Sequence, residues 1–253
     1  MINIYEEKIG NIPVLQIVQA DKIKSALPTV VYYHGFRGEK DSSLTLAYKL
    51  ANEGFRVVLP DSKLHGKRQE HISERELDLS FWDIVIANIE ELNDIKKYLE
   101  EKQLLLSGRI GVGGTSMGGI TTFSALKTYS WIKVGTVLMG TPKISEFANI
   151  LIDDFNAIHE EKITEEEREE VLHKLRKYDL DREPMKLQNR PLFIWHGEED
   201  KVVPHEQSEN FYGKVKNLYE KEDYIKMVKE KGRGHHISRL SIQEAVNWFK
   251  KHL

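Results

Sequence analysis

A short glycine-rich stretch, residues 109–119, constrains the fold of this chain more than any other. Its sequence, RIGVGGTSMGG, predicts a buried strand that runs into a tight turn, with a helix directly after it. Inside it, residues 114–118 fit the pattern G-x-S-x-G, in which a serine stands at the tip of a strained turn and glycines remove Cβ atoms that would clash. We therefore predict that Ser116 projects from the carboxyl edge of a sheet. The backbone N–H of Met117, in the first helical turn, is then free to donate to an anion.

Two phosphate-binding patterns that use the same glycines fail. A G-x-G-x-x-G pattern that starts at Gly111 meets Ser116 where its third glycine belongs. A Walker pattern that starts at Gly113 meets Gly119 where a lysine is required. A glycine-rich turn without a function stays open as an interpretation of this stretch alone.

Composition and charge are those of an ordinary globular protein. The 253 residues are 40% hydrophobic and 30% charged, with a net charge of −3, which suits one large α/β domain. The chain has no long basic run, no apolar stretch near the roughly 18 residues of a membrane span, and no cysteine. The first residues are acidic where a signal peptide is basic. We therefore expect a cytoplasmic protein that binds neither nucleic acid nor a membrane.

Strand and helix patterns alternate along most of the chain. Residues 2–19 predict two strands, and Pro13 near the start of the second suits an edge strand. From residue 28 onward the alternation favours a parallel sheet covered on both faces. Besides the strand before Ser116, strands are predicted at residues 28–33, 55–60, 134–139, 191–195 and 224–228. Residues 61–79 are predicted to be a polar loop, after which Ser80 and Asp83 cap a long helix.

Residues 143–190 interrupt this alternation. They contain no convincing strand and two helical patterns, of which the first has an apolar face that includes Phe147, Leu151 and Phe155. The second begins at Thr164, with Glu167 as its cap partner, and its narrow apolar stripe places it at the surface. We predict one domain, residues 1–253, in which residues 143–190 form a small helical cap above the carboxyl edge of the sheet.

Three loops at the carboxyl ends of predicted strands offer Ser116, Asp200 and His235, in that order along the chain. A serine hydroxyl is a weak nucleophile until an imidazole takes its proton. The imidazole needs a carboxylate that fixes its tautomer and stabilises its positive charge. The chain therefore offers one candidate for each of these roles.

Neighbouring residues compete for two of the roles. Glu198 and Glu199 precede Asp200, and His236 follows His235. The glycine directly before His235 favours it over His236 as the base.

Four other histidines lie in loops of the predicted sheet edge. His34 and His196 precede glycines at strand ends, where structural roles are more common. His65 and His71 lie in a polar loop without a cluster of carboxylates, so no metal site is expected there.

Four motifs together resemble a known superfamily. They are HGFRG at residues 34–38, GTSMG at 114–118, HGxxDxxVP at 196–204, and the pair Gly234-His235. The sequence is similar to a small bacterial serine hydrolase of the α/β-hydrolase superfamily, from the branch that contains dienelactone hydrolases and the prolyl oligopeptidase catalytic domain. The resemblance covers nearly the whole chain.

The resemblance implies an α/β-hydrolase fold, with a mostly parallel sheet of about eight strands, helices on both faces and a cap inserted at residues 143–190. It implies that Asp200 is the acid of a catalytic triad. It also implies that an oxyanion hole is formed by the backbone N–H groups of Phe36 and Met117.

The residues and the resemblance together predict a carboxylic-ester hydrolase that acts through an acyl-enzyme. Ser116 is the predicted nucleophile, His235 the base and Asp200 the residue that orients it. No cofactor or metal is expected, because side chains and backbone dipoles supply the activation, and the partner is a small-molecule ester. We expect at least one of Phe147, Leu151 and Phe155 to line the substrate pocket.

Alternatives stay open from the sequence alone. A peptidase or a thioesterase uses the same machinery, although a peptidase of the prolyl oligopeptidase kind normally carries a large propeller domain for which 253 residues leave no room. A non-catalytic binding protein that kept the fold is the alternative from another class. The sequence leaves the oligomeric state and both halves of the ester open.

Overall fold

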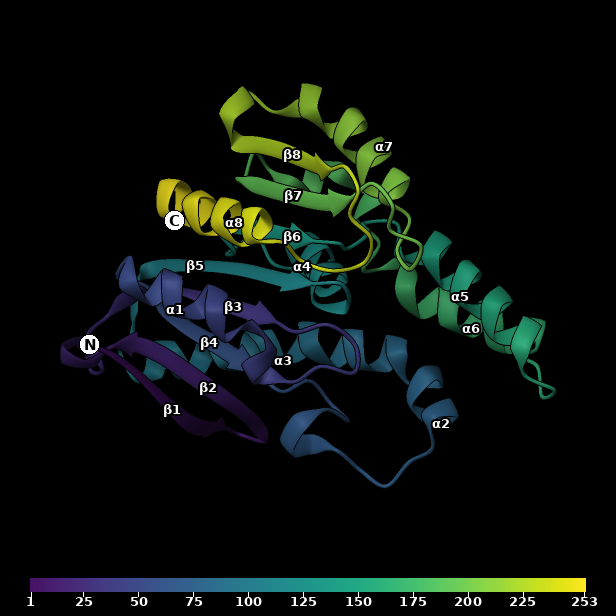
Figure 1. The fold of residues 1–253 in the computed structure, drawn as a ribbon, viewed down its shortest axis with the longest axis horizontal. Coiled ribbons are helices and arrows are strands. Elements are labelled where there is room, and N and C mark those ends of the chain that lie inside the picture. Colours follow the sequence, from purple (N-terminus) through teal and green to yellow (C-terminus); the bar gives the residue numbers. More distant parts are fainter.

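The computed structural model describes residues 1–253 and contains one eight-stranded sheet (Figure 1). Its strands are β1 Ile2–Ile9, β2 Ile12–Gln19, β3 Leu27–Tyr33, β4 Arg56–Pro60, β5 Leu105–Thr115, β6 Val134–Leu138, β7 Leu192–Gly197 and β8 Ile225–Glu230. They are arranged in the order β1-β2-β4-β3-β5-β6-β7-β8. Strands β3 to β8 are parallel, whereas β2 is antiparallel to both β1 and β4. The predicted mostly parallel sheet of eight strands is confirmed.

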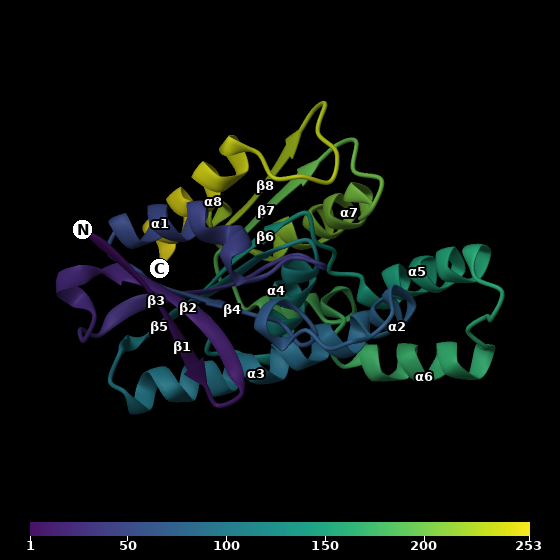
Figure 2. The same cartoon turned by 60° about the horizontal axis from the view of Figure 1, so that its bottom comes forward.

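Helices cover both faces of this sheet (Figures 1 and 2). They are α1 Leu44–Asn52, α2 Glu74–Leu79, α3 Phe81–Glu101, α4 Met117–Thr128, α5 Ile144–Ile158, α6 Glu165–Arg176, α7 His205–Val215 and α8 Arg239–His252. Helices α1 and α8 pack on one face, and α3, α4 and α7 pack on the other. A parallel sheet that is buried on both faces explains why its strands are nearly continuous apolar runs.

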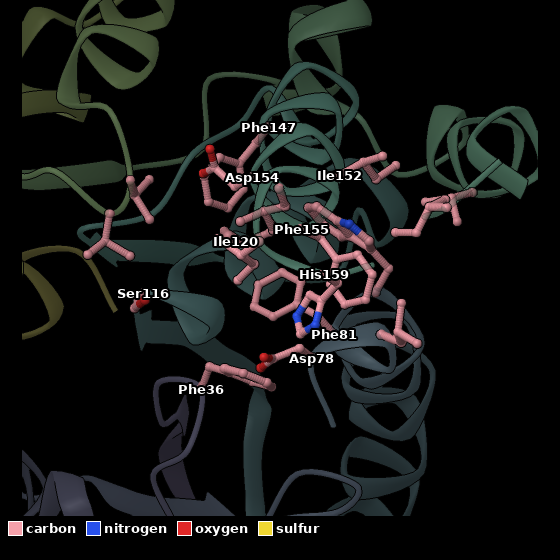
Figure 3. A pocket seen from close by; sticks show the side chains of 18 of the residues that line it. Phe36, Asp78, Phe81, Ser116, Ile120, Phe147, Ile152, Asp154, Phe155 and His159 are labelled. Carbon is pink, nitrogen blue, oxygen red and sulfur yellow. The ribbon is translucent and has the colours of Figure 1, made fainter. Parts of the chain in front are cut away.

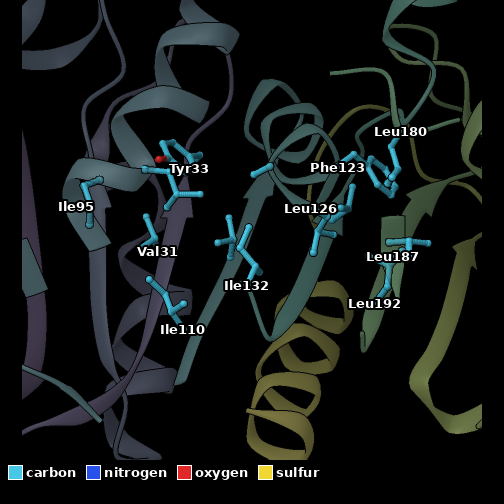
Figure 4. Close-up of a cluster of buried hydrophobic side chains, with 14 of the residues drawn as sticks. Val31, Tyr33, Ile95, Ile110, Phe123, Leu126, Ile132, Leu180, Leu187 and Leu192 are labelled. Carbon is cyan, nitrogen blue, oxygen red and sulfur yellow. The ribbon is translucent and has the colours of Figure 1, made fainter. Parts of the chain in front are cut away.

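Two hydrophobic clusters fill the space between the sheet and these helices. The larger contains 24 buried residues, among them Val31 of β3, Ile95 of α3 and Phe123 of α4 (Figure 4). The cluster on the other face contains 21. Each large apolar side chain that is fully buried contributes about 1.5–3 kcal/mol, so the sheet is a stable platform for the loops at its edge.

The edge position predicted for Pro13 is wrong. Strand β1 pairs along the whole of β2 and is itself the edge strand. The ladder between β2 and β4 runs from Val14 to Ile17. Pro13, which has no N–H to donate, stands just outside that ladder.

The region between β4 and α3 contains more structure than the polar loop predicted there. Ser73 and Glu76 form a reciprocal capping box at the start of α2, a pattern that the sequence displays as S-x-x-E. The cap predicted at Ser80 is wrong, because its backbone is helical and its hydroxyl donates to the carbonyl oxygen of Glu76. An N-cap needs a non-helical residue, and α2 runs into α3 without one.

Residues 143–190 form no strand and contain α5 and α6, which lie side by side and project beyond the carboxyl edge of the sheet (Figure 2). Thr164 and Glu167 form the predicted capping box of α6. Helix α5 packs through Phe147 and Ala148 into a cluster of 12 buried residues shared with α3 and α4. The division of the chain into a domain and an inserted cap stays a prediction.

None of the helices combines the length and the apolar composition needed to cross a bilayer.

Candidate active site

Ser116 lies between β5 and α4 with φ 55° and ψ −115°, a strained backbone conformation for a residue with a side chain. The flanking glycines make this turn possible. A Cβ atom on Gly114 would lie 2.2 Å from the carbonyl carbon of Gly118, and a Cβ on Gly118 would lie 2.2 Å from the carbonyl oxygen of Tyr33. The G-x-S-x-G spacing is therefore required by the close approach of β3, β5 and α4.

A continuous line of hydrogen bonds joins Ser116, His235 and Asp200. Ser116 Oγ lies 2.8 Å from His235 Nε2, and His235 Nδ1 lies 2.7 Å from Asp200 Oδ2. Since an ionised carboxylate only accepts, Nδ1 carries the proton and Nε2 is left to accept from the hydroxyl. Chemically, this arrangement allows the imidazole to remove the proton of the serine.

Asp200 accepts four hydrogen bonds. Oδ1 accepts from the backbone N–H groups of Val202 and Val203, at 2.9 and 3.0 Å. Oδ2 accepts from His235 and, at 3.1 Å, from Nε2 of the buried His196, which shares its proton with the carbonyl oxygen of Val203 at 2.9 Å. Burial alone would raise the pKa of Asp200, but the donors outweigh it and hold this pKa well below its usual range. The carboxyl group therefore stays ionised and able to stabilise a positive charge on His235.

Glu230, the last residue of β8, holds the loop that carries His235. Its carboxylate accepts hydrogen bonds at 3.1, 2.6 and 2.9 Å from the side chains of Trp195, Ser238 and Arg233. Gly197 lets this loop approach the acid loop, because a Cβ there would lie 2.4 Å from the carbonyl oxygen of Arg233. Sequence reasoning did not single out Glu230, since nothing but its position at a strand end marks it.

The competing neighbours lie elsewhere. His236 is exposed, and its Nε2 lies 3.2 Å from Nη1 of Arg233. The backbone N–H of Glu198 donates to the carbonyl oxygen of Glu230 at the end of β8, and that of Glu199 donates to the carbonyl oxygen of Arg233. It is therefore Asp200 and His235 that the structure brings next to Ser116.

The loop after β3 lies against the serine. A Cβ on Gly35 would be 3.5 Å from Cβ of Ser116, so the backbone of Phe36 runs beside the turn. The N–H groups of Phe36 and Met117 donate to no other group of the chain. Met117 opens α4, where the first N–H groups lack a helical partner and the helix dipole favours negative charge. Both N–H groups are therefore available to an anionic oxygen.

Two buried histidines fix the backbone on either side of Phe36. His34 Nδ1 donates to the carbonyl oxygen of Gly35 at 2.7 Å, and His65 Nε2 accepts from the N–H of Arg37 at 2.9 Å. Burial lowers the pKa of His34 to about 4 and also lowers the pKa of His65, so both rings are neutral near pH 7. The contact of His65 was missed, because it joins residues 28 positions apart in the sequence.

His71, from the same loop as His65, is exposed. No group of three or more His, Cys, Asp or Glu side chains in the chain is arranged to hold a metal ion.

A cavity of about 610 Å³ opens beside Ser116 (Figure 3), within the range of about 300–1,000 Å³ typical of small-molecule sites. Fourteen of its 20 lining residues are hydrophobic. They include the three residues of the cap expected there from the sequence, Phe147, Leu151 and Phe155.

Comparison with known proteins identifies the family. The model of the prolyl oligopeptidase family matches residues 86–253. A protein of Bacillus subtilis that bears the name "Putative esterase YitV" is 40% identical to this chain over 100% of both chains. This chain belongs to the prolyl oligopeptidase family. The esterase YjfP of Escherichia coli is also similar, with 28% identity over 100% of both chains.

A solved structure shares the fold of this family member. TT1662 of Thermus thermophilus superposes with a TM-score of 0.79 at 16% identity, covering 99% of this chain and 98% of that one. The α/β-hydrolase fold and the superfamily indicated by the sequence motifs are thereby confirmed. As a member of the prolyl oligopeptidase family, the chain is a serine hydrolase.

Proposed function

We propose that this chain hydrolyses carboxylic esters of small molecules through an acyl-enzyme. Ser116 Oγ attacks the ester carbonyl carbon while His235 Nε2 takes its proton and Asp200 stabilises the resulting imidazolium. The carbonyl oxygen becomes anionic and accepts hydrogen bonds from the N–H groups of Phe36 and Met117. His235 then protonates the departing alcohol. A water molecule, deprotonated by the same imidazole, releases the acid and regenerates the serine.

One observation carries this proposal. The hydroxyl of a strained, glycine-flanked serine lies 2.8 Å from an imidazole whose other nitrogen lies 2.7 Å from a buried carboxylate. The names of YitV and YjfP, both of which match over their whole length, favour esters over peptides. None of the proposed steps needs a cofactor. The cytoplasmic location stays a prediction.

Labelling with a fluorophosphonate and hydrolysis of p-nitrophenyl butyrate test the proposal together. Ser116→Ala should abolish labelling and lower kcat/KM by about 10⁴-fold or more, because the nucleophile is lost. Its melting temperature should stay close to that of the wild type, since only one oxygen is removed. Ser107→Ala is the matched control, because Ser107 is exposed at the opposite end of β5 and should leave both signals unchanged.

Three outcomes separate the alternatives. A wild-type chain that does not label and hydrolyses nothing would be a non-catalytic binding protein. A chain that cleaves thioesters or peptide amides faster than esters of the same acyl group would be a thioesterase or a peptidase. Wild-type turnover in Ser116→Ala would remove Ser116 from the mechanism.

A further inference from the structure

The large cavity borders the reacting serine but not the histidine beside it. Ser116, Phe36 and Val203 line the cavity, whereas His235 and Asp200 do not. On the proposed function, on which this inference rests, the departing alcohol must reach Nε2 of His235 to receive its proton. The alcohol half of the ester therefore lies on the side of His235, and the cavity is left for the acyl half.

We infer that the cavity is an acyl-binding chamber that selects esters of bulky, apolar, uncharged carboxylic acids. The alcohol half is held only loosely. His235, beside which the alcohol leaves, has a side chain that is 21% exposed and is followed by the exposed His236. The specificity of the enzyme therefore lies in the acid and not in the alcohol.

A row of aromatic rings, which we call the aromatic wall, extends from the loop after β3 to helix α5. The ring of Phe36 meets that of Phe81 edge to face at 5.2 Å, Phe81 meets Trp82 at 4.9 Å, and Trp82 meets Phe147 at 6.2 Å. Figure 3 shows Phe36, Phe81 and Phe147 around the cavity, with Ser116 at its margin. Ile120, one helical turn after Ser116 and fully buried, adds to this surface. Such a wall excludes water and favours an apolar acyl group.

The ionisable residues of the cavity disfavour an anionic acyl group. Three lining residues are carboxylates, one is an arginine and one is a histidine: Asp78, Asp154, Glu167, Arg37 and His159. Arg37 is already paired, at 3.0 Å with Asp78 and at 3.7 Å with Glu74. A second carboxylate on the acyl chain would thus meet three carboxylates and an arginine that is already paired, and it would lose its hydration.

Two ester series test which half of the substrate the enzyme selects. In the first, p-nitrophenol is the constant leaving group and the acyl chain grows from acetyl to decanoyl. We expect kcat/KM to rise by up to about fourfold per methylene until the chamber is full. In the second, octanoate is esterified with methanol, ethanol, butanol or hexanol. Across that series we expect kcat/KM to vary by less than about fourfold, the effect of one methylene. A steeper dependence on the alcohol than on the acyl chain would overturn the inference.

A matched pair of variants tests whether the cap forms the chamber. Leu151→Ala should reduce kcat/KM for decanoate several-fold relative to acetate, because Leu151 lines the cavity. Ile150→Ala is the control, since Ile150 is the preceding, partly buried residue of α5, packs on the same cluster and does not line the cavity. An unchanged acyl profile in Leu151→Ala would overturn the role of the cap.

The charge preference has its own test. The p-nitrophenyl ester of octanoic acid should be hydrolysed at least about tenfold faster than the mono-p-nitrophenyl ester of octanedioic acid, which buries a carboxylate. Asp154→Asn should bring the ratio of these two rates closer to one, because it removes a negative charge from the cavity. Asp153→Asn removes the same charge from the preceding residue, which pairs with Arg168 and does not line the cavity, and should leave the ratio unchanged. Equal rates on the two esters would overturn the charge preference.

Failure of this inference is distinguishable from failure of the proposed function. If Ser116 is labelled by the fluorophosphonate and esters are hydrolysed without the expected acyl or charge preference, the protein is a serine esterase and the acyl chamber is ruled out. A chain that neither labels nor turns over any ester fails the proposed function itself.

Discussion

The carboxyl edge of the sheet and the cap above it hold their residues in different ways. At the edge, Ser116, His235 and Asp200 are joined by hydrogen bonds of 2.7–2.8 Å, and the Asp200 side chain is fully buried. Helix α5 presents apolar side chains to the cavity, and an exposed ion pair joins the loop after it to α2. The ion pair between Arg75 and Glu161 has a distance of 2.7 Å, but the Glu161 side chain is 80% exposed.

The difference follows from what each region has to do. Proton transfer and oxyanion binding require atoms placed to within about 0.5 Å, which only locked side chains provide. Binding an apolar acyl group requires a surface of suitable size and little directionality. A region that must admit and release substrate also has to open, and exposed ion pairs are weak enough to allow that.

After Ser116→Ala, the largest expected effect tests the fixed geometry of the edge at the base. His235→Ala removes the base and should lower kcat/KM by about 10³-fold or more. His236→Ala is the matched control, and as an exposed surface change it should have little effect on either activity or stability. Steady-state kinetics on one ester measure both variants. A greater loss in His236→Ala than in His235→Ala would reverse the assignment of the base.

A smaller effect is expected from a substitution of His65, which positions the loop after β3 that carries Phe36. His65→Ala leaves the N–H of Arg37 without its acceptor. The peptide bond between Phe36 and Arg37 is then less firmly held, and so is the backbone of Phe36. Losing an oxyanion donor costs about 10²–10³ in kcat, so a displaced donor should lower kcat by about 10- to 100-fold with little change in KM. His71→Ala, in the same loop but exposed, is the control.

Partial rescue distinguishes this positioning role from a merely structural one. His65→Gln keeps a side-chain acceptor and should recover part of kcat, whereas melting temperatures of the two variants should be similar. A raised KM at unchanged kcat would contradict the positioning role.

The contrast between the two regions also explains what the sequence could predict. The glycines around Ser116 prevent clashes within a single turn, and Asp200 accepts hydrogen bonds from residues two and three positions later. Such local requirements leave a fixed spacing in the sequence. The contact of His65 with Arg37 joins two loops, and no spacing within either loop reveals it.

The same reasoning applies to the cap and to α2. Helical periodicity predicted that Phe147, Leu151 and Phe155 share one side of α5, but it does not say whether that side meets the sheet domain or a cavity. The pattern S-x-x-E at Ser73 marks a true cap, whereas the similar pattern at Ser80 does not. Periodicity and capping patterns describe one helix, and they carry no information about the preceding backbone or the packing partner.

The smallest expected effects concern two ion pairs. One lies near the carboxyl edge of the sheet, and the other lies between α2 and the loop that joins α5 to α6. Arg68 and Glu91 tie the loop of His65 to α3 through two hydrogen bonds of 2.8 and 2.7 Å, with side chains only 17% and 22% exposed. Arg75 and Glu161 make the single exposed pair that joins α2 to the loop between α5 and α6. Double-mutant cycles with arginine-to-glutamine and glutamate-to-glutamine substitutions isolate the coupling energy of each pair.

We expect a coupling of about 1.5–3 kcal/mol for Arg68–Glu91, because its hydrogen bonds are bidentate, charge-assisted and shielded from water. For Arg75–Glu161 we expect about 0.2–1 kcal/mol, as for other exposed pairs. Urea unfolding in 0.05 M and 1 M NaCl should show a further difference. At 1 M the Debye length falls to about 3 Å, so the coupling of Arg75–Glu161 should vanish while most of that of Arg68–Glu91 persists. Equal couplings with equal salt dependence would mean that the loop between α5 and α6 is held to α2 as firmly as the loop of His65 is held to α3, and would contradict the contrast between the two regions.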